Sequence, residues 1–228
     1  MDKSRGKSPS VGLDPLDRVG WLARQPAGFK AWAADVGRWR QFAAGEIIYL
    51  PGDEPDGMYG LGSGALEITF PLQGEEVVTI HRAEPGFWIG EAALMAGATR
   101  LVGLSAAFES RVFHLPLGAL RDLLRHEPGA WRNLYEQSFD NLAVALTLLA
   151  ESLALSPRAR IAKLLLRLAD ADGNVRGNQD DFGRLIGMTR SSVRRALTSL
   201  VEEGTIRTGY RATEIVDVEG LRVTCREA

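Results

Sequence analysis

The segment 179-QDDFGRLIGMTRSSVRRALTSL-200 decides how the C-terminal part of the chain folds. Its apolar residues recur at helical spacing on both sides of a glycine, which predicts two short helices joined by a tight turn. Gly187 supplies the turn, and the small Gly183 leaves room for the second helix to pass closely. The first helix is expected to bury Phe182, Leu185 and Ile186.

The second predicted helix has two distinct faces. Thr189 can cap its N-terminus through its side-chain hydroxyl. With Arg190 placed at 0° and about 100° added per residue, one side of the helix, at roughly 240–340°, is apolar. The opposite side, at roughly 0–140°, is basic and hydroxylated and has no acid. The apolar side holds Val193, Ala196, Leu197 and Leu200; the basic side holds Arg190, Ser191, Arg194, Arg195 and Thr198.

The basic face suits phosphates and guanine edges, because an arginine can donate two hydrogen bonds to guanine O6 and N7. A solvated basic face on an ordinary helix would have the same pattern, so the next segment matters. Residues 205–208 and 213–216 predict two strands joined by 209–212, a β-wing with a basic tip. A helix-turn-helix followed by a wing is a recognised DNA-binding layout. We therefore predict DNA contacts from Thr189, Arg190, Ser191, Ser192, Arg194, Arg195 and Arg211, with Arg207 as a further phosphate contact.

The N-terminal half reads as short strands separated by glycine turns. Many short strands with frequent turns predict an all-β roll or barrel. The run Gly60–Gly64 is expected to be a hairpin turn, since no helix with a lysine follows it as in a phosphate loop. The predicted strands are Glu46–Leu50, Leu66–Phe70, Val77–His81 and Arg111–Leu115.

Helices are expected around this roll, at Gly28–Arg40, at Leu117–His126 and over a long stretch from Pro128 to Leu155. The long helix has apolar residues at steps of mostly three and four. Such a stripe is either intrachain core or a helix–helix seam between two copies, and we favour the seam. Ser156-Pro157 then starts a further helix, Arg158–Ala169. The stripe comprises Trp131, Leu134, Leu142, Leu146, Leu149 and Leu153.

Charge is unevenly distributed along the 228 residues. Residues 1–156 carry 14 basic and 19 acidic side chains, a balance of −5, and residues 157–228 carry 13 and 10, a balance of +3. A basic C-terminal part on an acidic body is consistent with a polyanionic partner. The N-terminal ten residues lack the apolar core of a signal peptide, and no apolar run reaches the ~20 residues of a membrane helix. We therefore expect a cytoplasmic protein without a membrane partner.

The order of roll, long helix and winged helix-turn-helix resembles the CRP/FNR family of transcription regulators. The resemblance covers nearly the whole chain beyond residue 20. It implies an α+β fold with an N-terminal double-stranded β-helix (jelly-roll-like) sensor domain, a long dimerisation helix and a C-terminal winged helix-turn-helix. The expected divisions are a tail at 1–20, the sensor at 21–127, the helix and hinge at 128–156 and the DNA-binding domain at 157–228. The motifs that carry it are Pro51-Gly52-Asp53, Ile89-Gly90-Glu91, Arg160-Ile161-Ala162, Ile186-Gly187-Met188-Thr189-Arg190 and Leu200-Val201-Glu202-Glu203-Gly204-Thr205-Ile206.

The resemblance also implies partners. Members of the family are homodimers on near-palindromic DNA, with half-sites about 34 Å apart, and RNA polymerase is an implied further partner. Arg190 and Arg195 match the guanine-reading arginines of the family. Ser191 stands where the catabolite-activator branch has a glutamate, so a different half-site is expected. The implied dimer contacts are Leu142, Leu146, Leu149 and Leu153.

A cyclic nucleotide is the ligand that the resemblance suggests for the roll. Gly90 and Glu91 match the ribose-binding pair, and Arg100 matches the phosphate-binding arginine. The next residue, Leu101, cannot donate to phosphate, and the adenine-binding positions of the long helix fall on Ala145 and Leu146. A buried phosphate needs a full set of donors, so the sequence favours a different ligand or none.

Other functions lack the residues they need. Cys225 is the only cysteine, which excludes an iron–sulfur cluster and an intrachain disulfide. His81 is the one candidate haem ligand, and a lone strand histidine is more often structural. The three histidines and one cysteine do not suggest zinc, and no catalytic motif points to an enzyme. The alternative from another class is a ligand-binding module that regulates a protein partner; DNA affinity that falls steeply with salt would distinguish the two.

Overall fold

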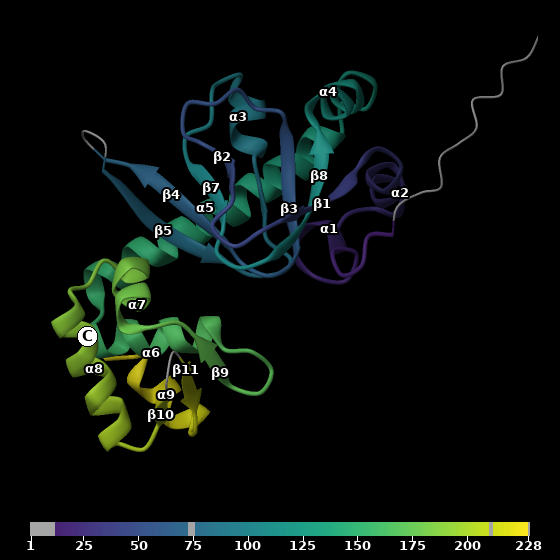
Figure 1. The fold of residues 1–228 in the computed structure, drawn as a ribbon. Coiled ribbons are helices and arrows are strands. Elements are labelled where there is room, and N and C mark those ends of the chain that lie inside the picture. The colour runs from purple at the N-terminus through teal and green to yellow at the C-terminus, as the bar shows by residue number, and fades with distance from the viewer. Residues whose placement is uncertain (1–11, 73–75, 210–211, 228) are drawn as a thin grey trace, which may run out of the picture. The chain divides into compact units, whose positions relative to one another are not determined.

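The computed structural model describes residues 12–72, 76–209 and 212–227. The chain divides into two compact units, Met1–Leu142 and Ala143–Ala228, and each is described by itself. The fold is the predicted combination of a β-roll and a winged helix-turn-helix (Figure 1).

The first unit is a roll of two four-stranded antiparallel sheets. One sheet has the order β1-β8-β3-β6 and the other β2-β7-β4-β5. The strands are β1 (Arg38–Phe42), β2 (Ile47–Tyr49), β3 (Gly57–Ser63), β4 (Leu66–Pro71), β5 (Val77–Ala83), β6 (Trp88–Ile89), β7 (Gly103–Ala106) and β8 (Ser110–Pro116). Five helices begin in this unit: α1 (Gly20–Ala23), α2 (Ala27–Val36), α3 (Glu91–Ala96), α4 (Leu117–His126) and α5 (Ala130–Ala154).

The predicted helix Gly28–Arg40 is too long. Helix α2 ends at Val36, and Arg38 opens strand β1, which pairs with β8. Gly37 lies at the change because its backbone is extended and a side chain there would overlap the Phe113 ring. The helical periodicity continued past this point only by coincidence of spacing.

The expected hairpin turn at Gly60–Gly64 is wrong for most of its length. Gly60 to Ser63 belong to β3, which pairs with β8 and β6 and not with β4. A Cβ at Gly60 would overlap the Trp88 ring, and one at Gly62 would lie 2.5 Å from Cζ3 of Trp39. These glycines therefore make room for indole rings, and only Gly64, with φ of +88°, has the backbone of a turn.

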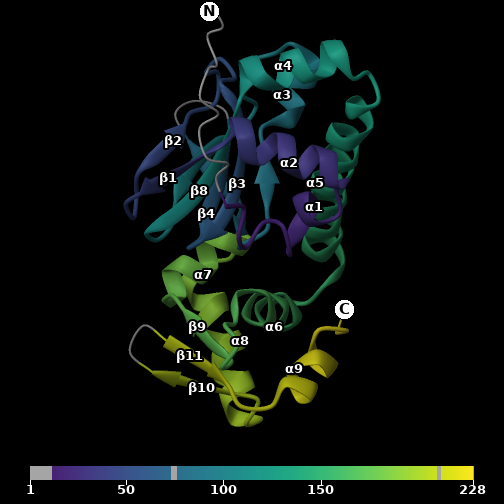
Figure 2. The same cartoon turned by 90° about the vertical axis from the view of Figure 1, so that its right-hand side faces the viewer.

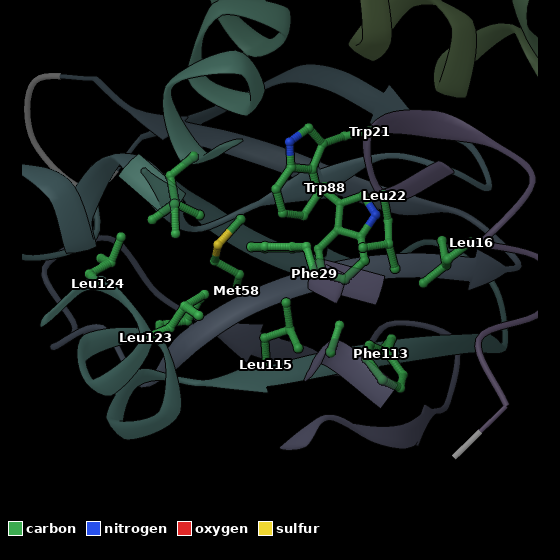
Figure 3. Packing of buried hydrophobic residues seen from close by; sticks show 14 residues of the cluster. Leu16, Trp21, Leu22, Phe29, Met58, Trp88, Phe113, Leu115, Leu123 and Leu124 are labelled. Carbon is green, nitrogen blue, oxygen red and sulfur yellow. The ribbon is translucent and has the colours of Figure 1, made fainter. Parts of the chain in front are cut away.

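Two apolar clusters stabilise the roll. One lies between the two sheets and includes Tyr49, Tyr59 and Leu61. The other packs helices against the β1-β8-β3-β6 sheet, and Figure 3 shows Trp21, Phe29 and Trp88 converging within it. The Trp21 and Trp88 rings meet edge to face at 5.2 Å. Large aromatic rings account for much of this buried area.

The second unit is a helical domain with a small three-stranded sheet. It contains the end of α5 and then α6 (Pro157–Leu168), β9 (Asn174–Arg176), α7 (Gln179–Ile186), α8 (Arg190–Glu202), β10 (Ile206–Gly209), β11 (Ala212–Ile215) and α9 (Val218–Thr224). The sheet order is β10-β11-β9, and Figure 2 shows its strands beside α8. As predicted, Ser156 caps α6 by accepting from Ala159 N, and Pro157 takes the first helical position.

Candidate functional site

The turn between α7 and α8 has the geometry that the sequence predicts. Asn178 and Asp181 form a capping box at the start of α7, and Gly187 ends that helix in the left-handed region with φ of +61°. A Cβ at Gly183 would lie 2.6 Å from the Met188 carbonyl oxygen, so only glycine fits there. Thr189 caps α8 by accepting a hydrogen bond from Ser192 N.

Helix α8 buries one face and exposes the other. Val193, Ala196, Leu197 and Leu200 are buried in the core of the domain, as predicted. Ser192 is half-buried, and its hydroxyl lies between the hydroxyl of Thr189 and the guanidinium of Arg195. The exposed side chains of this helix and its cap include Thr189, Arg190, Ser191, Arg194, Arg195 and Thr198.

An acidic residue lies beside this basic face. Nε of Arg190 is 3.5 Å from Oδ1 of Asp180 at the start of α7, and both side chains are mostly exposed. Both residues line a cavity of about 320 Å³ whose other wall is the β10–β11 hairpin. The helical-wheel argument could not find Asp180, because it considered α8 alone.

The predicted wing is the hairpin of β10 and β11, paired from Ile206–Ile215 to Gly209–Ala212. Nη1 of Arg207 lies 2.9 Å from Oε2 of Glu214 on the opposite strand. Arg211 at the predicted basic tip lies outside the described residues.

Helix α5 carries a continuous exposed apolar face, hereafter the α5 stripe. The four leucines predicted as dimer contacts are all exposed, and Leu153 reaches 79%. Leu134 does not belong to the stripe, since it is 1% exposed in the core beside Leu120 and Leu123. Aromatic residues extend the stripe toward the start of the helix. Its members, at steps of four and three residues, are Trp131, Tyr135, Phe139, Leu142, Leu146, Leu149 and Leu153.

The roll encloses a cluster of polar side chains around Arg100. This residue is 3% exposed and donates from Nη2 to Oδ1 of Asp56 and to the Gly57 carbonyl, both at 2.8 Å. Nη1 donates to the Gly90 carbonyl at 3.3 Å. The guanidinium carbon lies 4.2 Å from the centre of the Tyr49 ring. The two predicted ligand residues Gly90 and Arg100 are therefore in direct contact.

Asp56 is held by donors from three strands or loops. Tyr59 donates its hydroxyl to Oδ2 at 2.6 Å, and Nε2 of His114 lies 3.5 Å from the same oxygen. Burial raises the pKa of the carboxyl, but the Tyr59 and Arg100 hydrogen bonds and the nearby positive charge bring it below its ordinary value. Burial lowers the pKa of His114, assisted by Arg40 and Arg100.

Glu91, the third predicted ligand residue, contacts helix α5. It is 2% exposed, and its Oε1 accepts from Ser138 Oγ at 3.1 Å and from Asn141 Nδ2 at 3.0 Å. Burial raises the pKa of this carboxyl despite these hydrogen bonds. Oε2 of Glu91, the Tyr49 hydroxyl and Nε of Arg100 are buried without a hydrogen-bond partner among the described residues.

The family positions on α5 do not offer adenine a hydroxyl. Ala145 and Leu146 are exposed, and Thr147 Oγ1 donates to the Ala143 carbonyl of its own helix. Sequence reasoning missed Asp56, Tyr49 and Tyr59, and the charge of Asp56 immediately before a strand was the only signal available. It also missed Ser138 and Asn141, which follow one another at helical spacing on the α3 side of α5.

Other candidate sites were sought across the described ranges 12–72, 76–209 and 212–227. Within them, no group of three or more His, Cys, Asp or Glu side chains could hold a metal ion. His81 packs its ring 5.5 Å from that of Phe87, and Cys225 is half-buried, with burial raising its thiol pKa. None of the described helices is long and apolar enough to cross a membrane.

Two family models match the chain. Residues 39–127 match a cyclic nucleotide-binding domain, and residues 159–224 match a Crp-like helix-turn-helix domain. The transcriptional regulator LdrP of Thermus thermophilus is 31% identical over 190 residues, which cover 80% of this chain and 94% of the relative. The CRP-like cAMP-activated global transcriptional regulator of Mycobacterium tuberculosis is 26% identical over 191 residues, covering 79% and 84%.

Solved structures show the same fold. A second Thermus thermophilus protein, a transcriptional regulator of the CRP family, superposes with a TM-score of 0.68 at 26% identity, covering 83% of this chain and 97% of that one. FixK2 of Bradyrhizobium japonicum gives 0.73 at 21% identity, covering 85% and 99%. Together with the family models, these similarities show that the chain belongs to the CRP/FNR family of transcription regulators.

Proposed function

We propose that this protein is a sequence-specific DNA-binding transcription regulator that inserts α8 into the major groove. The observation that carries the proposal is the exposed basic and hydroxylated face of α8, on a helix whose other face is buried. A helix of this width fits the major groove, where each base pair presents a distinct set of donors and acceptors. The Crp-like helix-turn-helix match supports the same function.

Individual side chains are assigned roles by their chemistry. Arg190 and Arg195 read guanine through paired hydrogen bonds, and Arg194 contacts a phosphate or a further base. The hydroxyls of Thr189, Ser191 and Ser192 contact phosphates near the helix N-terminus, where the helix dipole favours an anion. Arg207 and Arg211 of the wing contact the backbone.

We further propose that the protein acts as a homodimer through the α5 stripe. The stripe repeats every three and four residues along a 25-residue helix, which is the pattern of a two-helix seam. A twofold dimer presents two α8 helices, so the operator is near-palindromic with half-sites about 34 Å apart. The functional divisions are then sensor 21–127, dimerisation helix 128–156 and DNA-binding domain 157–228, with 1–20 as a tail.

The roll is proposed as the regulatory domain, and its effector is left open at this point. RNA polymerase is the expected protein partner, and a cytoplasmic location stays a prediction. No role as an enzyme is proposed.

The deciding experiment selects bound fragments from random duplexes with the purified full chain. We expect one enriched near-palindromic motif and an affinity for it that falls steeply as salt rises, through counterion release. Absence of DNA affinity at low salt would overturn the proposal and favour the ligand-binding module that regulates a protein partner. Sedimentation of the free protein tests the dimer separately.

A further inference from the structure

We propose that Asp56 is a built-in occupant of the anion-binding site at Arg100 and that it excludes phosphate-bearing ligands, cyclic nucleotides among them, from the roll. This makes Asp56 a specificity-determining residue. The inference concerns the roll interior alone and does not depend on how, or whether, the protein binds DNA.

Three potential donors of the site converge on one carboxylate. Arg100 Nη2 donates to Oδ1 at 2.8 Å, and the Tyr59 hydroxyl donates to Oδ2 at 2.6 Å. His114 Nε2 lies 3.5 Å from Oδ2. A guanidinium, a phenol and an imidazole around two oxygens are what an anionic ligand would otherwise use.

The rest of the Arg100 guanidinium is also engaged by the chain. The Gly90 and Gly57 carbonyls accept from its two terminal nitrogens, and the Tyr49 ring covers one face at 4.2 Å. Nε is buried and has no hydrogen-bond partner within the described part of the chain. A phosphate could reach this guanidinium only by displacing Asp56, and with Asp56 in place it would meet a like charge.

The residues that match the nucleotide-binding motif of the family serve internal contacts instead. Gly90 has φ of +112°, and a Cβ there would lie 2.6 Å from Arg100 Nη1, so this glycine accommodates the seat of the arginine itself. Glu91 faces Ser138 and Asn141 on α5. Leu101, at the position of the usual phosphate-binding hydroxyl, is 70% exposed. The residues present therefore do not fit a cyclic nucleotide.

The side chain of Asp56 is 52% exposed although its partner, the Arg100 side chain, is 2% exposed. Asp56 thus closes the site from the solvent side. Removing its charge should expose Arg100 and Tyr59 to a small anion without rebuilding the roll. The structure consequently assigns the roll a single state that needs no nucleotide.

The test is ligand binding by the full chain, with cyclic AMP, cyclic GMP and inorganic phosphate as probes in calorimetry and thermal unfolding. Wild type should show neither saturable binding nor a rise in Tm at about 1 mM of any probe. Asp56→Ala should bind at least one probe with an affinity about tenfold or more above wild type. Asp56→Ala combined with Arg100→Met should lose that gain. Glu54→Gln, which removes an exposed acid from the same loop, is the matched control and should behave as wild type.

Asp56→Ala leaves a buried guanidinium without its carboxylate, so a second variant guards against loss of folding. Asp56→Asn keeps the shape of the side chain and removes only its charge, and it should show the same gain in weaker form. Saturable nucleotide binding by wild type would overturn the proposal, as would folded Ala and Asn variants that bind none of the probes. DNA binding is measured on the same samples, so a failure of the DNA-binding proposal would be seen separately.

Discussion

Arg190 Nε lies 3.5 Å from Asp180 Oδ1, so the first arginine of α8 shares its charge with a carboxylate at the start of α7. Both side chains are largely exposed, and such pairs are typically worth about 0–1 kcal/mol. Arg190 can therefore leave Asp180 for a DNA partner at small cost.

The first prediction concerns this acid. Asp180→Asn removes a negative charge beside the proposed DNA face, so DNA affinity should rise about two- to fivefold at low salt. The increase should be similar on cognate and unrelated duplexes, as measured by fluorescence anisotropy. Asp172→Asn changes an exposed acid elsewhere in the domain and is the control. A loss confined to the cognate duplex would instead mean that Asp180 orients Arg190.

The second prediction concerns base reading by α8. Arg195→Ala should weaken binding to the selected motif by about 1–3 kcal/mol and relax discrimination at one base pair, because a paired contact to guanine is lost. Arg222→Ala, on helix α9 and paired with Glu219, serves as the control. Equal losses on every sequence would make Arg195 a phosphate contact. Competition titrations with single-base variants of the motif distinguish the two.

The third prediction concerns the α5 stripe. Leu146→Asp should convert the dimer to monomer, because the seam would have to bury an unpaired charge. Thr147→Asp introduces the same charge one residue away, outside the stripe, and should leave the dimer intact. Sedimentation equilibrium measures both. A dimeric Leu146→Asp variant would place the interface elsewhere.

The fourth prediction follows from opposite pKa shifts at two carboxyls. Glu91 has a folded pKa raised above 4.5, so the folded state binds its proton more tightly and stability falls as pH rises through that raised pKa. Glu91→Gln should remove this loss and be more stable than wild type at neutral pH. Asp56 has a lowered pKa, so its contribution is present above the ordinary value and disappears as pH falls through the folded pKa. Urea denaturation across a pH series should therefore show opposite trends for Glu91→Gln and Asp56→Asn.

The fifth prediction tests the glycine in β3. Gly60→Ala should cost about 1–3 kcal/mol of unfolding free energy, since its methyl group would overlap the buried Trp88 ring. Gly118→Ala is the control in α4, where an added Cβ meets nothing within 4 Å. It should be neutral or stabilise by roughly 0.5–1 kcal/mol. Equal effects of the two changes in denaturant titrations would contradict the packing role.

Local chemistry explains which features the sequence predicts well. The turn at Gly187, the cap at Thr189 and the buried face through Leu197 depend on neighbours within one or two helical turns. The role of Gly60 is not predictable in this way, because its reason is Trp88, which is distant in sequence, and no local pattern reports that contact. Leu134 is wrongly predicted in the stripe because one helix serves two environments, a core at its start and an exposed face beyond it.

The sensor site shows the same limit more sharply. The sequence identified Gly90, Glu91 and Arg100, and it showed that Leu101 breaks the binding pattern. It could not identify Asp56, which lies 44 positions before Arg100 and reaches it only through the roll. Long-range pairing of charged groups is set by the fold, so it becomes visible only once the strands are in place.

The exposed α5 stripe has a consequence for dosage. In the proposed dimer, each operator needs two copies of the chain, and below the dissociation constant of the pair the concentration of dimer varies with the square of the monomer concentration. A modest change in synthesis or degradation then produces a larger change in operator occupancy. Leu142, Leu146, Leu149 and Leu153 would thereby give the gene targets a threshold set by the abundance of the protein.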